Sequence, residues 1–103
     1  LSDKNIDGLL CLEESSAIRS LVLLKQMNYR IPEEMSMICF TNGELPKYVS
    51  PSITTISQHG KSMGEISAGL LIDRIEGNKD QAPYQTKIIK TSLIQRESTR
   101  LIK

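Results

Sequence analysis

Polar side chains follow two apolar stretches of the sequence, and they are the residues best suited to contact a small molecule. An acidic pair beginning at Glu13 follows the apolar run 6–12, and Thr41 and Asn42 follow the run 35–40. Carboxylate, hydroxyl and amide groups all form hydrogen bonds with polar compounds. The pattern therefore indicates noncovalent recognition of a polar ligand.

Covalent catalysis and metal chemistry have little support in the sequence. His59 is the only histidine, and the nearby serines Ser57 and Ser62 do not supply the positioned base, nucleophile and orienting group that a hydrolase needs. The adjacent carboxylates of Glu13 and Glu14 would point to different sides on leaving a strand, so a shared cation would need ligands from elsewhere. We expect a binding protein without enzymatic activity, cofactor or metal.

Length and charge limit the chain to one small domain without a nucleic-acid or membrane surface of its own. It has 103 residues, and its 13 basic and 12 acidic side chains are interspersed, giving a net charge of +1. No apolar run approaches the roughly 20 residues of a membrane span. Because the sequence begins at Leu1 and enters an apolar run almost at once, we expect it to be a piece of a longer protein.

The first half has the pattern of a strand, a helix and a second strand. The runs 6–12 and 35–40 are continuous apolar stretches, as in parallel strands covered on both faces. Between them, apolar residues at spacings of three and four predict a helix capped by Ser15 and stopped at Asn28. This order predicts a βαβ unit with adjacent parallel strands. The polar residues after both strands would then share the edge where open α/β sheets bind ligands.

The second half contains a crossover strand, a helix and a final strand. Pro51 can open a strand, and the β-branched residues 53–56 behind it predict a short strand between two lobes. A loop with one turn of helix precedes this strand at 45–50. Apolar spacing predicts a helix over 61–76, and the β-prone stretch 85–95 predicts a last strand.

The two cysteines lie inside apolar runs. Cys11 and Cys39 have no CxxC neighbour, so a zinc or redox motif is not indicated. Buried free thiols are the expected state, and they fit a reducing cytosol.

Several motifs in register resemble the C-terminal part of the effector domain of LacI/GalR-family bacterial transcriptional regulators. The motifs are a strand ending in cysteine, Ile31-Pro32-Glu33-Glu34-Met35-Ser36, Pro51-Ser52-Ile53-Thr54-Thr55-Ile56, Met63-Gly64, Leu71-Ile72-Asp73-Arg74-Ile75-Glu76-Gly77 and Arg96-Glu97-Ser98-Thr99. Together they cover essentially the whole chain.

The resemblance implies an α/β, three-layer, periplasmic-binding-protein-like fold of type I, with two lobes that close on a small molecule. Residues 1–56 and about 85–96 would belong to the C-terminal lobe, and about 58–77 would complete the N-terminal lobe. The effector would be a carbohydrate or a derivative of one, in a cytoplasmic repressor. DNA would be bound only through an N-terminal head outside this sequence.

The resemblance also implies contact positions. Where the family has asparagine and aspartate after the first strand, this chain has Glu13 and Glu14, and where it has aspartate after the second strand, Thr41 and Asn42 stand. Gln58 matches a position that faces the cleft. The expected ligand contacts are therefore Glu13, Thr41, Asn42 and Gln58, two of them changed in chemical type.

Two further expectations follow. Lobes that are incomplete in this sequence would leave sheet edges and apolar surface exposed, which favours a homo-oligomer. A periplasmic sugar-binding transport receptor of the same fold is the alternative, but the ending at 96–100 favours the regulator.

Overall fold

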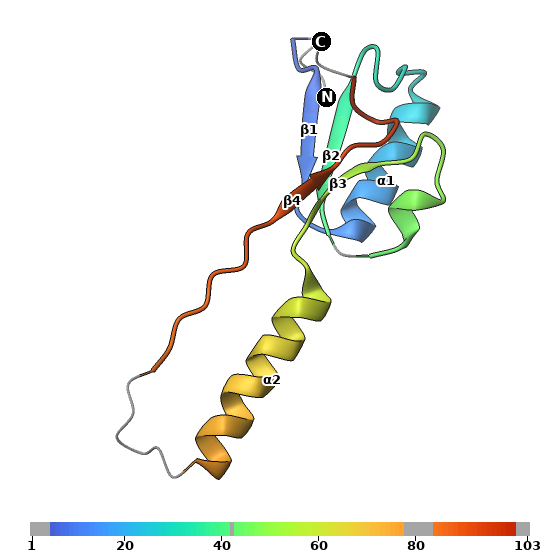
Figure 1. Cartoon of the computed structure of the whole chain (residues 1–103). Coiled ribbons are helices and arrows are strands. Elements are labelled where there is room, and N and C mark those ends of the chain that lie inside the picture. The colour runs from blue at the N-terminus through green and yellow to red at the C-terminus, as the bar shows by residue number, and fades with distance from the viewer. Residues whose placement is uncertain (1–4, 42, 78–83, 101–103) are drawn as a thin grey trace.

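The computed structural model describes residues 5–41, 43–77 and 84–100. Their helices and strands follow one another as β1 (Gly8–Cys11), α1 (Glu14–Gln26), β2 (Ser36–Phe40), η1 (Leu45–Lys47), β3 (Thr54–Ser57), α2 (Gly60–Glu76) and β4 (Ser92–Ile94) (Figure 1). The predicted βαβ unit and the single turn of helix in the loop before β3 are both confirmed.

The strands form one mixed sheet in the order β1-β2-β3-β4. The first three are parallel, and β4 runs antiparallel to β3. β1 and β2 pair from Gly8 opposite Ser36 to Cys11 opposite Cys39. The carboxyl ends of β1, β2 and β3 therefore lie at the same edge of the sheet.

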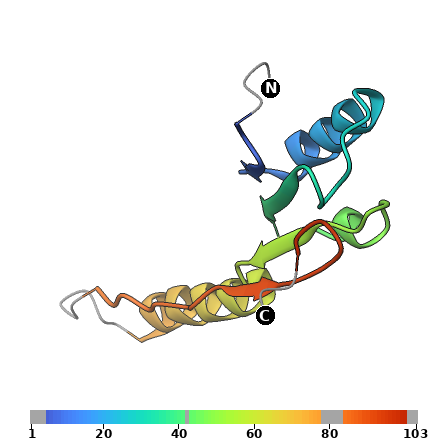
Figure 2. The same cartoon turned by 90° about the horizontal axis from the view of Figure 1, so that it is seen from above.

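Helix α1 covers one face of this sheet (Figure 2). The core that it closes consists of Cys11, Ala17, Leu21, Leu24, Met35, Met37, Cys39 and Ile53. Ala17, Leu21 and Leu24 lie three and four residues apart, so they form one stripe of the helix. The backbone of Asn28 is left-handed, with a φ of 62°, which confirms it as the residue that stops the helix.

The opposite face of the sheet stays open among the described residues. Side chains alternate between faces along a strand, so Leu10 points away from the face that buries Cys11. Leu10 is 58% exposed, and Leu12 and Leu93 are also exposed. Among the described residues, α1 supplies one covering layer, and the second layer expected from the apolar strands is not seen there.

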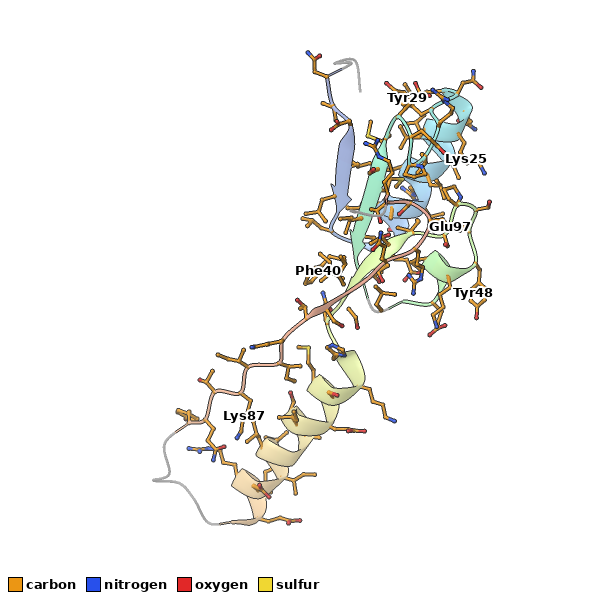
Figure 3. All side chains as sticks on the ribbon, turned by 45° about the horizontal axis from the view of Figure 1, so that its top comes forward. Lys25, Tyr29, Phe40, Tyr48, Lys87 and Glu97 are labelled. Atoms are coloured by element: carbon orange, nitrogen blue, oxygen red, sulfur yellow. The ribbon has the colours of Figure 1, made fainter. Side chains whose placement is uncertain are left out.

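Helix α2 and the segment that returns from it extend away from the sheet (Figure 1). The described chain measures 60 × 26 × 25 Å, with a radius of gyration of 18.8 Å, against about 13 Å for a compact domain of this length. No residue of α2 is buried. In Figure 3, Lys87 of the returning segment lies beside α2 and far from the sheet residue Phe40.

The final strand is shorter than its sequence predicts. A strand was expected over 85–95, but only Ser92–Ile94 pairs with a neighbour, the strand β3. Residues 84–91 contain β-prone side chains yet form no ladder. β-propensity reflects packing against neighbouring strands, and none lies beside this segment among the described residues.

The polar end of the chain is fixed to the sheet. The Ser98 hydroxyl donates to the Met37 carbonyl at 2.6 Å and accepts from the Thr54 amide at 2.8 Å. The backbone of Ser98 also bonds to Met37 and to Ser52. Ser98 is fully buried, so it fills the place between β2 and β3 where the two strands separate.

Candidate functional site

The candidate site lies at the edge where β1, β2 and β3 end. The Thr41 hydroxyl donates to Glu14 Oε2 at 3.2 Å and accepts from the Gly43 amide at 2.9 Å. Thr41 follows β2, and Glu14 is the first residue of α1. The hydrogen bond therefore joins the residues that follow two neighbouring strands.

A glycine at position 43 makes this contact possible. A Cβ atom added to Gly43 would collide with the carboxylate of Glu14. Any larger residue would push that carboxylate aside. The backbone at Gly43 and the side chain of Glu14 thus share one small space.

Glu13 faces different partners. Its carboxylate accepts from the hydroxyls of Ser16 at 2.9 Å and Ser15 at 3.0 Å. These hydrogen bonds, Ser16 first and Ser15 second, lower the pKa of the exposed Glu13 carboxyl. Of the two glutamates, Glu14 is the one that is hydrogen-bonded to Thr41. The sequence indicated Glu13, and not Glu14, as a ligand contact.

The start of α1 explains this arrangement. Ser15 was expected to cap the helix, but the cap residue is Glu13 and the helix begins at Glu14. The Ser15 hydroxyl bonds to the Glu13 carboxylate instead. The prediction that Ser15 caps the helix is therefore wrong by two residues. Because α1 begins at Glu14, the side chain of Glu14 can contact Thr41 at the end of β2.

A small polar hollow of about 170 Å³ adjoins Thr41. It is lined by Thr41, Gly43, Glu44, Lys47, Thr55, Ser57, Ile94 and Arg96. Pockets for drug-sized ligands are about 300–1,000 Å³. The hollow is thus large enough for part of a small polar molecule, and the described residues form one wall of such a site.

Both cations of the hollow already have protein partners. Lys47 Nζ lies 2.8 Å from Glu44 Oε2, and this ion pair lowers the pKa of the Glu44 carboxyl. Arg96 Nη1 donates to the Ile53 carbonyl at 2.8 Å and to the Thr55 hydroxyl at 3.2 Å. Lys47 is thus paired with a carboxylate, whereas Arg96 keeps its positive charge, because a carbonyl and a hydroxyl are neutral partners.

The other expected contacts lie near this edge or outside the described residues. Gln58 directly follows β3 and is half-buried, but neither it nor Glu13 lines the hollow. Asn42 lies outside the described residues, so its expected contact stays a prediction. In Figure 3, Tyr48 points outward from the loop on the other side of the sheet from Phe40.

His59 lies at the junction between the sheet and α2. It is the cap residue of α2, and its backbone is left-handed with a φ of 52°. The His59 amide donates to the Ser57 hydroxyl at 3.2 Å, and the ring Nε2 lies 3.0 Å from the Ser92 hydroxyl. The ring thus connects the outgoing and returning segments.

Two searches of the described residues bear on site chemistry. They contain no group of three histidine, cysteine, aspartate or glutamate side chains placed to hold a metal ion. Among the same residues, no helix has the length and apolar character needed to cross a membrane.

The parallel strands, the polar residues at their carboxyl edge and the crossover into α2 give the chain the architecture of an open α/β sheet domain. The family model described as a periplasmic binding protein-like domain matches residues 2–99, and the chain belongs to this family. Within it, the relatives are transcriptional regulators of the LacI type. The fold class expected from the sequence is confirmed.

Two curated relatives illustrate the similarity. The HTH-type transcriptional repressor PurR of Vibrio cholerae is 33% identical over 79 residues, which are 77% of this chain and 24% of the relative. The ribose operon repressor of Haemophilus influenzae is 26% identical over 96 residues, 93% of this chain and 28% of the relative. The chain thus spans about a quarter of the length of these relatives.

Two solved structures extend the comparison. A LacI family regulator from Enterococcus faecium with bound ribose has a TM-score of 0.80 at 30% identity, over 94% of this chain and 36% of that one. A periplasmic binding protein/LacI transcriptional regulator from Alkaliphilus metalliredigens, complexed with D-xylulofuranose, has a TM-score of 0.83 at 30% identity, with the same coverage. The resemblance to regulators rather than to transport receptors is thereby confirmed.

Proposed function

We propose that the chain is the effector-sensing portion of a LacI-type transcriptional regulator. Its ligand contacts the carboxyl edge of β1, β2 and β3 and is enclosed by a second lobe. The observation that carries this proposal is the Thr41–Glu14 hydrogen bond beside the polar hollow, at the sheet edge where this fold class binds ligands. Ligand contacts by Glu13, Asn42 and Gln58 remain part of the proposal.

The ligand is a carbohydrate or a polyhydroxylated derivative. The carboxylate of Glu14 accepts hydrogen bonds from hydroxyl groups, and the Thr41 hydroxyl donates or accepts one. The solved relatives with bound ribose and D-xylulofuranose, both 30% identical to this chain, support a compound of this class. The Glu14 carboxylate next to Thr41 favours a neutral compound with hydroxyl donors over an anion.

The sensing mechanism is a shift between open and closed arrangements of two lobes. Residues 1–56 and about 85–96 form one lobe, and about 58–77 complete the other. A ligand that contacts both lobes favours the closed arrangement by the difference between its affinities for the two states. DNA is contacted by an N-terminal head outside this sequence, in the cytoplasm, and the net charge of +1 supports a role for this chain other than gripping DNA.

Self-association is a further part of the proposal. The open sheet face exposes Leu10, Leu12 and Leu93, and α2 exposes Leu71 and Ile75. Exposed apolar surface of this kind favours pairing with a second copy. Sedimentation of the 103-residue chain should give a homo-oligomer, whereas a monodisperse monomer with cooperative unfolding would contradict this part.

The test is ligand binding by the full-length protein that carries this chain. Calorimetric titration and thermal melting against a panel that includes ribose and xylulose should identify a compound that raises Tm. Glu14→Gln removes the charge next to Thr41 and should weaken that binding about tenfold, as for a lost charged hydrogen bond of ~1.5–3 kcal/mol. Glu33→Gln is the matched control, since Glu33 is exposed in the turn before β2, at the opposite end of that strand from Thr41.

Two outcomes would overturn the proposal. Equal losses of affinity in the Glu33→Gln and Glu14→Gln variants would show that the Glu14 carboxylate has no specific role in ligand binding. Failure of the unmodified full-length protein to bind any compound of the panel, while it still binds DNA, would exclude carbohydrate sensing.

A further inference from the structure

Two free cysteines occupy facing positions on neighbouring strands. Cys11 is the last residue of β1, and it is the register partner of Cys39 in β2. Register partners on adjacent strands project their side chains toward the same face, which here is the face covered by α1. Both thiols are buried and unoxidised, as expected from the sequence.

The backbone spacing allows these cysteines to be joined. Adjacent strands lie about 4.7–4.9 Å apart, and disulfides connect Cα atoms about 4.4–6.8 Å apart. The Cα spacing expected for Cys11 and Cys39 as register partners therefore suits a disulfide. Facing side chains on parallel strands nevertheless keep their Cβ atoms near the strand spacing, so the bond would pull the two strand ends together.

The surroundings distinguish the two thiols. Burial raises the pKa of Cys39 to about 11, with the neighbouring Cys11 as a smaller cause in the same direction. Burial also raises the pKa of Cys11, but a hydrogen bond with Ser20 opposes that effect. Cys11 retains slight exposure, at 6%, whereas Cys39 has none. Cys11 is therefore the first thiol that a small oxidant can reach, and Cys39 is held next to it.

We propose that Cys11 and Cys39 form an oxidation site, in which a peroxide converts the facing thiols into a reversible disulfide between β1 and β2. The Cys11 thiol loses its proton as its sulfur attacks one peroxide oxygen and becomes a sulfenic acid. The departing oxygen takes up that proton and leaves as water when the peroxide is hydrogen peroxide. The Cys39 sulfur then displaces the sulfenic hydroxyl as a second water. Two thiols lose two electrons and two protons, and the peroxide takes up both.

The site lies directly beneath the candidate ligand edge. Cys11 and Cys39 each stand two residues before a predicted contact, Glu13 and Thr41. The Cys39 thiol donates a hydrogen bond to the Glu13 carbonyl at 3.3 Å. Oxidation removes that donor and shifts the ends of both strands. This step rests on the proposed function, and we expect the disulfide to weaken effector binding.

Mass spectrometry of the intact chain tests the site itself. Hydrogen peroxide added to the dilute folded protein should remove the mass of two hydrogen atoms and protect both cysteines from alkylation after denaturation. Dithiothreitol should reverse both changes. Cys39→Ser should prevent the loss and leave Cys11 as a sulfenic acid that reacts with dimedone. The proposal would be overturned if both thiols could still be alkylated after peroxide treatment. It would also be overturned if disulfides formed only between chains.

A second measurement tests the coupling and needs no variant. Reduced and oxidised forms of the full-length protein are compared for binding of the compound found in the sugar panel, with an expected loss of about tenfold. Unchanged affinity in the oxidised form would overturn the coupling while the oxidation site stands. Absence of binding in the reduced form as well would contradict the proposed function, and the mass measurement would still decide the oxidation site.

Discussion

The two helices of the chain have similar apolar patterns and opposite surroundings. α1 places Ala17, Leu21 and Leu24 against the sheet and buries them, whereas α2 carries Met63, Ile66 and Leu70 at helical spacing and buries no residue. Burying one large aliphatic side chain contributes about 1.5–3 kcal/mol. The comparison shows that local sequence specifies both helices, but only one of them stabilises the sheet.

Polar residues also differ between the sheet, where they are buried, and the connection to α2, where they are exposed. Around β2 and β3, Ser98 and Thr54 are buried and hydrogen-bonded to backbone or to one another. The connection between the sheet and α2 depends on the exposed pair His59 and Ser92. We therefore expect the sheet with α1 to behave as a folded unit whose stability hardly depends on α2.

The largest expected effect is the difference in stability between two alanine variants, one in each helix. Leu24→Ala empties a fully buried site under α1 and should lower the free energy of unfolding by about 2–5 kcal/mol. Ile75→Ala removes a side chain of α2 that is 73% exposed, and it should change stability by no more than about 0.5 kcal/mol.

Urea denaturation of both variants at low protein concentration is the measurement. Equal losses would mean that α2 is packed against something as firmly as α1. A loss for Ile75→Ala that grows with protein concentration would instead identify α2 as the surface of self-association.

A smaller effect is expected at the end of the chain. Ser98→Ala removes the donor to the Met37 carbonyl and leaves the buried Thr54 amide without its acceptor. An unsatisfied buried polar group costs about 1–3 kcal/mol. Ser67→Ala in exposed α2 is the control, and it should be neutral or slightly stabilising because alanine favours helix. Equilibrium unfolding of the pair should rank them in this order, and a neutral Ser98→Ala would contradict the structural role of the chain end.

The smallest effect concerns pH. The amide and hydroxyl of Ser52 donate to the Glu97 carboxylate at 3.1 and 3.0 Å, and these bonds lower the pKa of the exposed Glu97 carboxyl. Since its folded pKa lies below the unfolded value, the stabilisation is present above about pH 4.3 and is lost as pH falls through the folded pKa.

Denaturation midpoints measured at neutral and acidic pH test this prediction. The unmodified chain should lose more stability on acidification than Glu97→Gln does. Identical pH dependence in the two proteins would show that the contact with Ser52 contributes nothing.

Much of the fold could be predicted from the sequence because it follows from local periodicity. The stripe through Leu21 and Leu24, the left-handed stop at Asn28 and the two short strands around Cys11 and Cys39 all lie where the pattern indicates. The length of the last strand could not be predicted, because pairing requires a neighbour that residues 84–91 do not have.

The candidate site was predicted at the level of the sheet edge but not at the level of each side chain. The choice between Glu13 and Glu14 depends on where α1 begins, and Ser15 appeared to be an equally good cap. The burial of Ser98 depends on contacts with Met37 and Thr54, far away in the sequence. Composition and residue spacing do not predict contacts between residues that lie so far apart in the sequence.

The bond between His59 and Ser92 has a mechanical consequence. The chain leaves the sheet and returns to it through two neighbouring segments that are tied together at this bond. A double connection of this kind resists torsion about its long axis more than it resists bending across it. Any displacement of α2 would therefore have to move both segments together, because β3 and β4 also pair from Thr55 opposite Ile94 to Ser57 opposite Ser92.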